Sequence, residues 1–149
     1  MTYSDTITVN CTPEAAFALI CDLPGMGRFS PENTGGKWQR GATGPAVGAL
    51  FKGTNTAGAK NWTTTARVLE CDAPHSFQFA VSAFTMQVAL WTYRVESTPE
   101  GCRITESWTD RRRGLMKIMG DRMTPDREGF TKKSIATTLG TMKVILEGN

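Results

Sequence analysis

The stretch WTYRVESTPEGCRITESWTD, residues 91–110, decides the fold, because it predicts two long strands joined by a tight turn. Side chains alternate between the two faces of a strand, so its first half places Trp91, Tyr93 and Val95 on one face. The Pro-Glu-Gly turn at residues 99–101 is too short for a crossover connection. The two strands are therefore predicted to pair antiparallel.

The second strand of this pair carries a carboxylate on its apolar face. Ile104 and Trp108 predict that this face is buried, yet Glu106 lies between them. A buried carboxylate is costly unless it is paired, hydrogen-bonded, protonated or in water. Three interpretations compete: an ion pair with an arginine such as Arg40 or Arg67, a wet position near the open end of a cavity, or an acid or base with a raised pKa that faces a ligand.

Upstream of this pair, the sequence predicts a strand, a helix and a further run of strands. The helix, residues 12–23, has Thr12 as its cap and Pro13 at its first position. Gly and Pro punctuate residues 24–36, which predict a loop with at most one helical turn. Strands are predicted at residues 4–10, 37–40, 47–55, 61–72, 76–81 and 86–97.

Downstream, the chain closes with two helices. The first covers residues 114–123. The second is predicted to begin with Thr124 as its cap and Pro125 at its first position, and to run as far as Gly148. This order predicts one α+β domain over residues 1–149. A curved antiparallel sheet of six to seven strands would hold the long terminal helix on its concave side, with a cavity left between sheet and helix.

Several segments resemble a known group of proteins. They are TPEAAFALICDL (12–23), VGALFKG (47–53), NWTTTARVLECDAPHSFQF (61–79), WTYRVESTPEGCRITESWTD (91–110) and TLGTMKVILE (138–147). The chain resembles the START/Bet v1-like (SRPBCC) superfamily of helix-grip proteins, and specifically its bacterial polyketide cyclase/dehydrase-like members. The resemblance implies a ligand cavity under the last helix. Members of the superfamily bind lipids or hormones, cyclise polyketides or serve as co-chaperone domains, so the fold alone does not identify the function.

Aromatic side chains on the inward faces are the first candidates for binding a ligand. Any one of them fits ordinary core packing, but the set suits a cavity that holds a flat apolar molecule by stacking. Tyr93 and Gln87, on the same face of one strand, can donate hydrogen bonds, and Glu106 with Tyr93 are the candidate catalytic groups. The aromatic set is Trp38, Phe51, Trp62, Phe77, Phe79, Trp91, Tyr93 and Trp108. The orientation of Trp38 is left open because its strand is short, so the predicted ligand contacts are the other seven aromatic residues with Gln87, Glu106, Met116, Met119 and Met123.

Three methionines on the short helix form a second group. Met116, Met119 and Met123 fit flexible core filling, or an adaptable gate to the cavity, since Gly114 and Gly120 loosen the same stretch. Asp110 is expected at the cavity rim.

Charge and composition exclude several other functions. A net charge of +3 argues against strong capture of nucleic acid or of an anionic membrane. The run Arg111–Arg113 fits a solvated junction better than a nucleic-acid site, with an anionic ligand at the cavity mouth as the alternative. No apolar run reaches the roughly 20 residues that span a bilayer. The N-terminus lacks the basic and apolar regions of a signal peptide, so we expect a cytoplasmic protein. No exposed seam demands a stable oligomer, so we expect a monomer or a weak homodimer.

The sequence predicts neither a metal nor a cofactor. Its four cysteines are scattered and are predicted to be free buried thiols, and His75 is the only histidine. No glycine-rich phosphate loop follows a strand. The first functional hypothesis is therefore the binding of a hydrophobic, ring-containing small molecule, polyketide-like or lipid-like. A polyketide cyclase or dehydratase using the same cavity is the alternative, and a co-chaperone-like interaction module is less favoured.

Overall fold

The computed structural model describes residues 2–148. Its strands and helices follow the expected order of strand, helix, six strands and terminal helices. The elements are β1 (Thr2–Val9), α1 (Pro13–Cys21), the short 3₁₀ helix η1 (Leu23–Arg28), β2 (Asn33–Trp38), β3 (Leu50–Ala57), β4 (Lys60–Asp72), β5 (Ser76–Ala83), β6 (Met86–Thr98), β7 (Gly101–Asp110), α2 (Gly114–Met123) and α3 (Arg127–Glu147).

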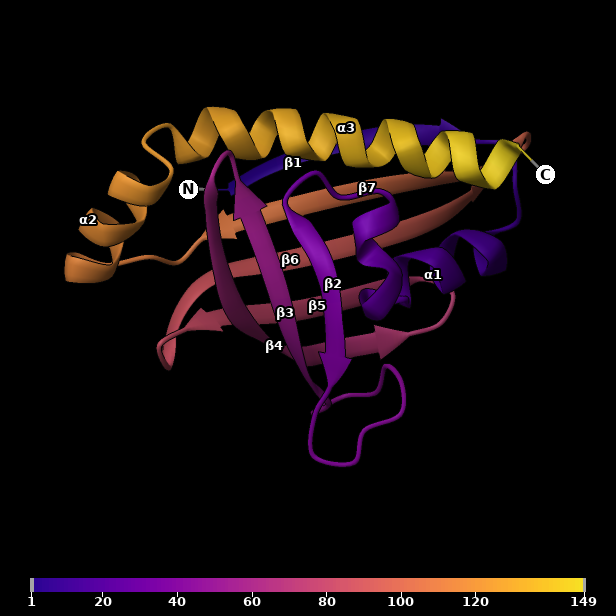
Figure 1. The fold of residues 1–149 in the computed structure, drawn as a ribbon. Helices are drawn as coiled ribbons and strands as arrows, with labels where there is room; N and C mark the ends of the chain where they lie inside the picture. The colour runs from indigo at the N-terminus through magenta and orange to yellow at the C-terminus, as the bar shows by residue number, and fades with distance from the viewer. Residues whose placement is uncertain (1, 149) are drawn as a thin grey trace.

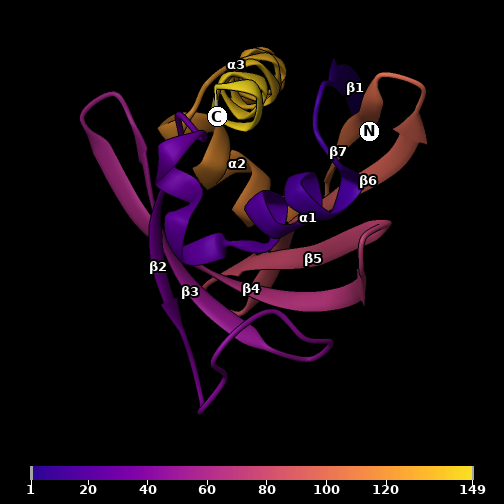
Figure 2. The same cartoon turned by 90° about the vertical axis from the view of Figure 1, so that its right-hand side faces the viewer.

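All seven strands form one antiparallel sheet in the order β1-β7-β6-β5-β4-β3-β2. The sheet curls around α3, which lies along its open side (Figures 1 and 2). A sheet this wide cannot stay flat, because the right-handed twist accumulates from strand to strand. The predicted α+β helix-grip fold is confirmed.

Helix α1 begins as its sequence predicts. The Thr12 hydroxyl accepts a hydrogen bond from the Ala15 amide at 3.1 Å, and Pro13 occupies the first turn. The helix packs against β5, β6 and β7, with Phe17 and Ile20 buried beneath it. This end of the sheet is filled by side chains of the core, which leaves the other end for a cavity.

Helix α3 starts later than predicted. The Thr124 amide donates to the Gly120 carbonyl at 2.8 Å and its hydroxyl donates to the same oxygen at 3.1 Å, so Thr124 ends α2. The cap of α3 is Asp126, whose carboxylate accepts from the Gly129 amide at 3.1 Å. Pro125 lies in the connection between the helices. The predicted start of α3 at Thr124 and Pro125 is therefore wrong, because the hydrogen bonds of Thr124 complete the last turn of α2 and the cap of α3 is Asp126.

Strand β2 also differs from its prediction, since it begins at Asn33 and not at Lys37. Its two glycines suggested a loop, but they serve the close approach of neighbouring backbone. A Cβ on Gly36 would overlap the Lys52 carbonyl of β3, and Gly35 has a φ of 106°. This strand brings Asn33 onto the inner face of the sheet edge.

The four cysteines are free thiols, but the prediction that all four are buried is met only in part. Cys21 and Cys102 are buried, whereas Cys11 and Cys71 are half-buried. The Sγ atoms of Cys11 and Cys102 lie 3.7 Å apart. Within residues 2–148, no helix is long and apolar enough to cross a membrane.

Candidate functional site

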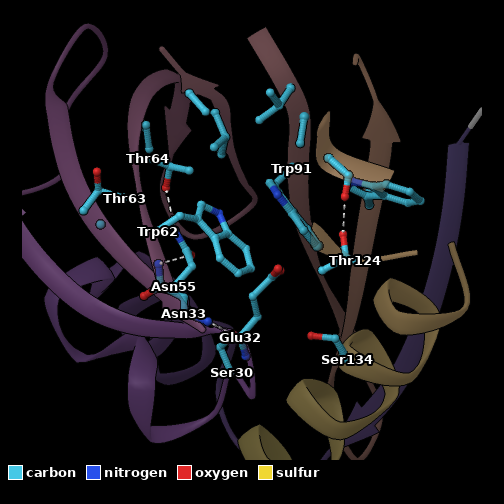
Figure 3. Close-up of a pocket in the computed structure, with 18 of the residues that line it drawn as sticks. Ser30, Glu32, Asn33, Asn55, Trp62, Thr63, Thr64, Trp91, Thr124 and Ser134 are labelled. Carbon is cyan, nitrogen blue, oxygen red and sulfur yellow. Dashed lines mark hydrogen bonds between the residues drawn. The ribbon is translucent and has the colours of Figure 1, made fainter. Parts of the chain in front are cut away.

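A cavity of about 630 Å³ lies between the concave face of the sheet and helices α2 and α3 (Figure 3). Pockets that bury small molecules usually enclose about 300–1,000 Å³, so its size suits a multi-ring ligand. Ten of the twelve predicted ligand-contacting residues line it: Phe51, Trp62, Phe79, Trp91, Tyr93, Glu106, Trp108, Met116, Met119 and Met123.

Aromatic rings form the apolar wall of the cavity. Trp91 and Trp108 stand directly opposite each other on β6 and β7, with ring centroids 6.5 Å apart and planes tilted by 40°. Trp62, on β4, and Trp91 are only half-buried, and both point into the cavity (Figure 3). Large ring faces that remain uncovered in a cavity are suited to stacking on a flat ligand.

Glu106 lies within this apolar wall and is 3% exposed. It stands opposite Tyr93 in the register of β6 and β7, and its Oε2 accepts a hydrogen bond from the Tyr93 hydroxyl at 2.6 Å. Its Oε1 is buried and has no hydrogen-bond partner among the described residues. A buried polar atom without a partner is rare in a folded protein, and it calls for an explanation such as a functional role.

The surroundings of Glu106 favour its neutral form. Burial raises the pKa of this carboxyl to about 8, the nearby Asp5 carboxylate on β1 acts in the same direction, and the Tyr93 hydrogen bond opposes both. Burial and the same pair also raise the pKa of Tyr93 well above its usual value. At neutral pH, Glu106 is therefore mostly a carboxylic acid, which can donate as well as accept a hydrogen bond.

Two of the three sequence-based interpretations of Glu106 are contradicted. Arg40 and Arg67 are both exposed, Arg67 on the outer face of β4, and neither forms an ion pair with Glu106. A wet position at the cavity mouth is inconsistent with a side chain that is 3% exposed. The third interpretation, an acid or base with a raised pKa that faces a ligand, is compatible with the place of Glu106 in the cavity lining, and its role towards a ligand stays a prediction.

A polar strip borders the aromatic wall beside Trp62, and the sequence analysis missed it. The Asn33 side-chain amide donates to Asn55 Oδ1 at 3.2 Å, and the Asn55 amide donates to the Thr64 hydroxyl oxygen at 3.0 Å (Figure 3). The Thr64 hydroxyl accepts this bond, so its own hydrogen remains free to donate. An asparagine at an inward position of a strand was a detectable signal, since Asn is depleted in strands.

Helix α3 adds two hydroxyl groups from the opposite side. Ser134 and Thr138 line the cavity, and neither side chain makes a hydrogen bond to any residue in the range 2–148. The cavity therefore combines an aromatic wall with several polar groups that have free hydrogen-bonding capacity.

The charged groups at the cavity mouth are compensated within the protein. Arg127 forms an ion pair with Glu32 at 2.8 Å and lies over the rings of Phe130 and Trp62. Arg112 pairs with Asp110 at 2.8 Å and with Asp121 at 3.1 Å. Acidic side chains thus neutralise both arginines at the cavity mouth, so these arginines do not by themselves favour an anionic ligand.

Asp110 is half-buried and lies beside the rim, outside the residues that line the cavity. Burial acts to raise its pKa, but the hydrogen bonds and positive charge of Arg112 outweigh this effect and hold the pKa below its usual value. Asp110 is therefore an ionised partner of Arg112.

The three methionines of α2 all line the cavity, to different degrees of exposure. Met116 is buried, whereas Met119 and Met123 remain partly open to solvent. Gly120 lines the cavity beside them, and Gly114 begins the helix with a φ of 54°. This placement is compatible with a gate, and the gating role stays a prediction.

Two of the predicted contact residues lie outside the cavity. Phe77 is fully buried between Phe17 and Phe79 under α1, so it belongs to the core. Gln87 is exposed, because Val88 is an extra residue in β6 where Val81 pairs with Ala89 and Ser82 with Gln87. This β-bulge reverses the alternation of faces, so Val88 lines the cavity and Gln87 does not.

Trp38 is also outside the lining residues. Its ring packs edge-on against Phe51, its cross-strand partner, at 5.3 Å between centroids, so it supports the cavity wall from the side. His75 is exposed in its turn, as predicted. Residues 2–148 contain no cluster of three or more His, Cys, Asp or Glu side chains that could hold a metal ion.

Comparison with protein families finds one matching family model, described as polyketide cyclase / dehydrase and lipid transport, over residues 1–147. A comparison with curated protein sequences finds no match.

Solved structures share the fold at low sequence identity. A polyketide cyclase-like protein from Corynebacterium glutamicum is 23% identical with a TM-score of 0.63, and the match covers 97% of this chain and 90% of that one. The di-domain ARO/CYC StfQ of the steffimycin biosynthetic pathway is 12% identical with a TM-score of 0.74, over 97% of this chain and 50% of that one. Ara h 8.0201 is 14% identical with a TM-score of 0.63, over 95% and 97% of the two chains.

Proposed function

The chain belongs to the polyketide cyclase / dehydrase and lipid transport family, and we propose that it binds a hydrophobic, ring-containing small molecule in the cavity under α3. The observation that carries the proposal is a cavity of about 630 Å³ with uncovered aromatic rings and one buried carboxyl oxygen that lacks a partner. Apolar walls supply the affinity for such a ligand, and a few placed polar groups orient it.

The polar groups define which ligand chemistry fits. A ligand that turns Glu106 Oε1 towards the cavity would receive a hydrogen bond from the neutral carboxyl on a carbonyl or hydroxyl oxygen. The Thr64, Ser134 and Thr138 hydroxyls offer further donors on other walls. A flat, polyketide-like molecule with oxygen substituents at its edges could stack on the aromatic rings and also hydrogen-bond to the polar groups. A plain hydrocarbon chain could do only the first.

Native mass spectrometry of protein purified gently from its own host tests this proposal. A stoichiometric small-molecule adduct, released by denaturation and containing rings and oxygen groups, is the expected result. A protein that stays bare, and that also fails to bind any of a panel of oxygenated polycyclic compounds by tryptophan fluorescence, would contradict it.

A cavity-filling variant provides the matched control. Ala89 lies on the inner face of β6 and lines the cavity, whereas its neighbour Leu90 lies on the opposite face and outside the lining residues. The Ala89→Phe variant should lose the adduct, and the Leu90→Phe variant should retain it. Equal retention by both would mean that the ligand binds elsewhere.

A second candidate function is catalysis of cyclisation or dehydration in the same cavity. It is favoured by the Glu106–Tyr93 pair, because an acid with a pKa of about 8 is matched to proton transfer near neutral pH. In a cyclisation, the Glu106 proton would go to the carbonyl oxygen as a new carbon–carbon bond forms. The attacking carbon would give up its own proton, and the carboxylate would take it back.

The Glu106→Gln variant separates binding from catalysis. The amide keeps the shape and can still donate a hydrogen bond, so affinity for a ligand should change little. Turnover that depends on Glu106 as an acid should fall by about a hundredfold or more. An unchanged turnover rate would exclude Glu106 as the proton donor.

A further inference from the structure

We propose that helix α2 and the β5–β6 turn form a docking face for the surface of an anionic lipid bilayer. This inference goes beyond the proposed function, because it concerns the outer surface around the cavity mouth and not the cavity interior. Both elements lie at the same end of the molecule (Figure 1).

The first observation is an unpartnered apolar surface on α2. Leu115 is 69% exposed, Ile118 is 55% exposed and Met119 is 47% exposed. Their spacing of three and four residues puts them on one face of the helix, and only Met116 of the whole helix is buried. A short helix that turns its apolar face to solvent has the amphipathic form of interfacial membrane helices.

The β5–β6 turn adds a second exposed apolar group. Phe84 is 82% exposed at the tip of this turn, and Met86 beside it is 50% exposed. Phe84 and Thr85 have φ values of 52° and 67°, a conformation that favours Gly or Asn. A bulky exposed aromatic in this position costs stability, and such strain is concentrated at functional sites.

The charge of the molecule is concentrated on the same segment. Residues 111–123 contain five Lys or Arg and one Asp, a net charge of +4, whereas the whole chain carries +3. The remaining residues therefore carry a net charge of −1. Arg111, Arg113 and Arg122 are exposed and form no ion pair with any described residue. The low overall charge conceals a basic face that matches anionic lipid headgroups.

This face is continuous with the cavity mouth. Phe84, Met119 and Met123 are partly or largely exposed and also line the cavity. A face that meets a bilayer at this position would place the opening of the cavity against the lipid. An apolar ligand could then pass between bilayer and cavity without crossing water.

The same charges argue against a second copy of the chain as the occupant. A two-fold symmetric dimer would place the same patch of each subunit opposite the other. The exposed Arg111, Arg113 and Arg122 of the two faces, which form no ion pair with a described residue, would then repel one another. An anionic bilayer compensates the cations and also receives the apolar side chains.

Flotation with lipid vesicles tests the proposal on the intact protein. The expected result is binding to vesicles of phosphatidylcholine with phosphatidylglycerol, weaker binding at high salt, and little binding to phosphatidylcholine alone. The double variant Leu115→Ser/Ile118→Ser should bind about tenfold more weakly or worse, because it removes the apolar contribution. The Arg111→Gln/Arg113→Gln variant should lose most of the salt dependence.

Matched controls remove the same groups elsewhere. Val47 is 69% exposed and Val144 is 71% exposed, and they lie in the β2–β3 loop and near the C-terminal end of α3, away from α2 (Figure 1). The Val47→Ser/Val144→Ser variant should bind vesicles as the original protein does. Lys37→Gln/Lys52→Gln, on the outer face of β2 and β3, is the control for charge.

Several outcomes would overturn the proposal. They are equal binding to both kinds of vesicle, equal effects of test and control variants, or a homodimer that dissociates in the Leu115→Ser/Ile118→Ser variant. Ligand binding by each variant is measured separately without vesicles, so a failure of the docking face is distinguishable from a failure of the cavity to bind its ligand.

Discussion

At the scale of the residue, burial in the cavity wall changes the pH at which Glu106 ionises. Its pKa of about 8 lies far above the value of 4.5 in an unfolded chain, so the folded protein holds a proton that the unfolded chain releases. Below pH 4.5 both states are protonated, and this contribution to stability is fully present. As the pH rises towards 8, the free energy of unfolding should fall by about 1.4 kcal/mol per pH unit.

Urea denaturation of the original protein and of Glu106→Gln, at several pH values from 4 to 9, checks this prediction. The variant cannot ionise at this position, so the difference between the two proteins isolates the contribution of Glu106. The variant should gain stability relative to the original protein as the pH rises. A difference that stays constant with pH would mean that Glu106 titrates normally.

A second residue-scale prediction concerns Tyr93. Its hydroxyl donates to the Glu106 carboxylate and so favours the charged form. The Tyr93→Phe variant removes this donor, and the pKa of Glu106 should rise further. Carboxyl ¹³C chemical shifts followed through a pH titration measure the change directly, and a lowered pKa would contradict the assignment.

The sequence shows which way Glu106 points but not what it meets. Strand alternation between Ile104 and Trp108 is enough to predict an inward carboxyl. Its partner depends on the register between β6 and β7, which places Tyr93 opposite. Gln87 shows the limit of the same rule, since one extra residue at Val88 reverses the alternation and no sequence pattern announced that bulge.

At the scale of the element, the β5–β6 turn contains the least favourable backbone for its sequence. Phe84 and Thr85 both have positive φ values, which suit Asn-Gly far better. The double substitution Phe84→Asn/Thr85→Gly should raise the free energy of unfolding by about 1–2 kcal/mol, the usual cost of this conformation for ordinary residues. Thermal and urea unfolding measure the gain. A loss of stability would show that the Phe84 side chain packs favourably in the folded protein.

Most elements could be predicted from periodicity and caps, and the errors have local causes. Helix α1 begins with Thr12 and Pro13 as expected, because no competing element precedes it. At the start of α3 two polar residues could cap, and the sequence alone does not show that Thr124 serves the end of α2. In β2, Gly35 and Gly36 look like loop residues until the neighbouring backbone that they accommodate is known.

At the scale of the whole molecule, α3 ties the two edges of the sheet together. It packs along β1 at one edge, and Arg127 reaches Glu32, just before β2, at the other. Both side chains of this ion pair are largely buried. The Glu32→Gln variant leaves Arg127 without its partner, and the free energy of unfolding should fall by about 3 kcal/mol.

An exposed ion pair serves as the control for this prediction. Glu96 and Arg103 lie 4.0 Å apart on the surface. The Glu96→Gln variant should change the free energy of unfolding by about 0.5 kcal/mol or less. If urea denaturation gives similar losses for Glu32→Gln and Glu96→Gln, the Arg127–Glu32 ion pair contributes no more to the free energy of unfolding than an exposed ion pair does.

The overall architecture could be predicted because the order of elements leaves few alternatives. The aromatic wall followed from the inward faces of β3 to β7, where six of the predicted aromatic side chains line the cavity. The polar strip did not, because Asn33, Asn55 and Thr64 come from three strands whose relative register is a property of the folded sheet. The basic and apolar face around α2 was hidden by the small total charge.

That uneven distribution of charge makes the protein an electric dipole, with its positive pole at α2 and a slightly negative body. In the field of any anionic partner, a dipole experiences a torque as well as an attraction. A molecule that meets an anionic bilayer would therefore turn its basic face, and with it the cavity mouth, towards the lipid before contact. At physiological ionic strength the field that causes this alignment is screened beyond about 8 Å from the partner. It therefore raises the fraction of encounters that have the right orientation, but it does not speed diffusion over longer distances.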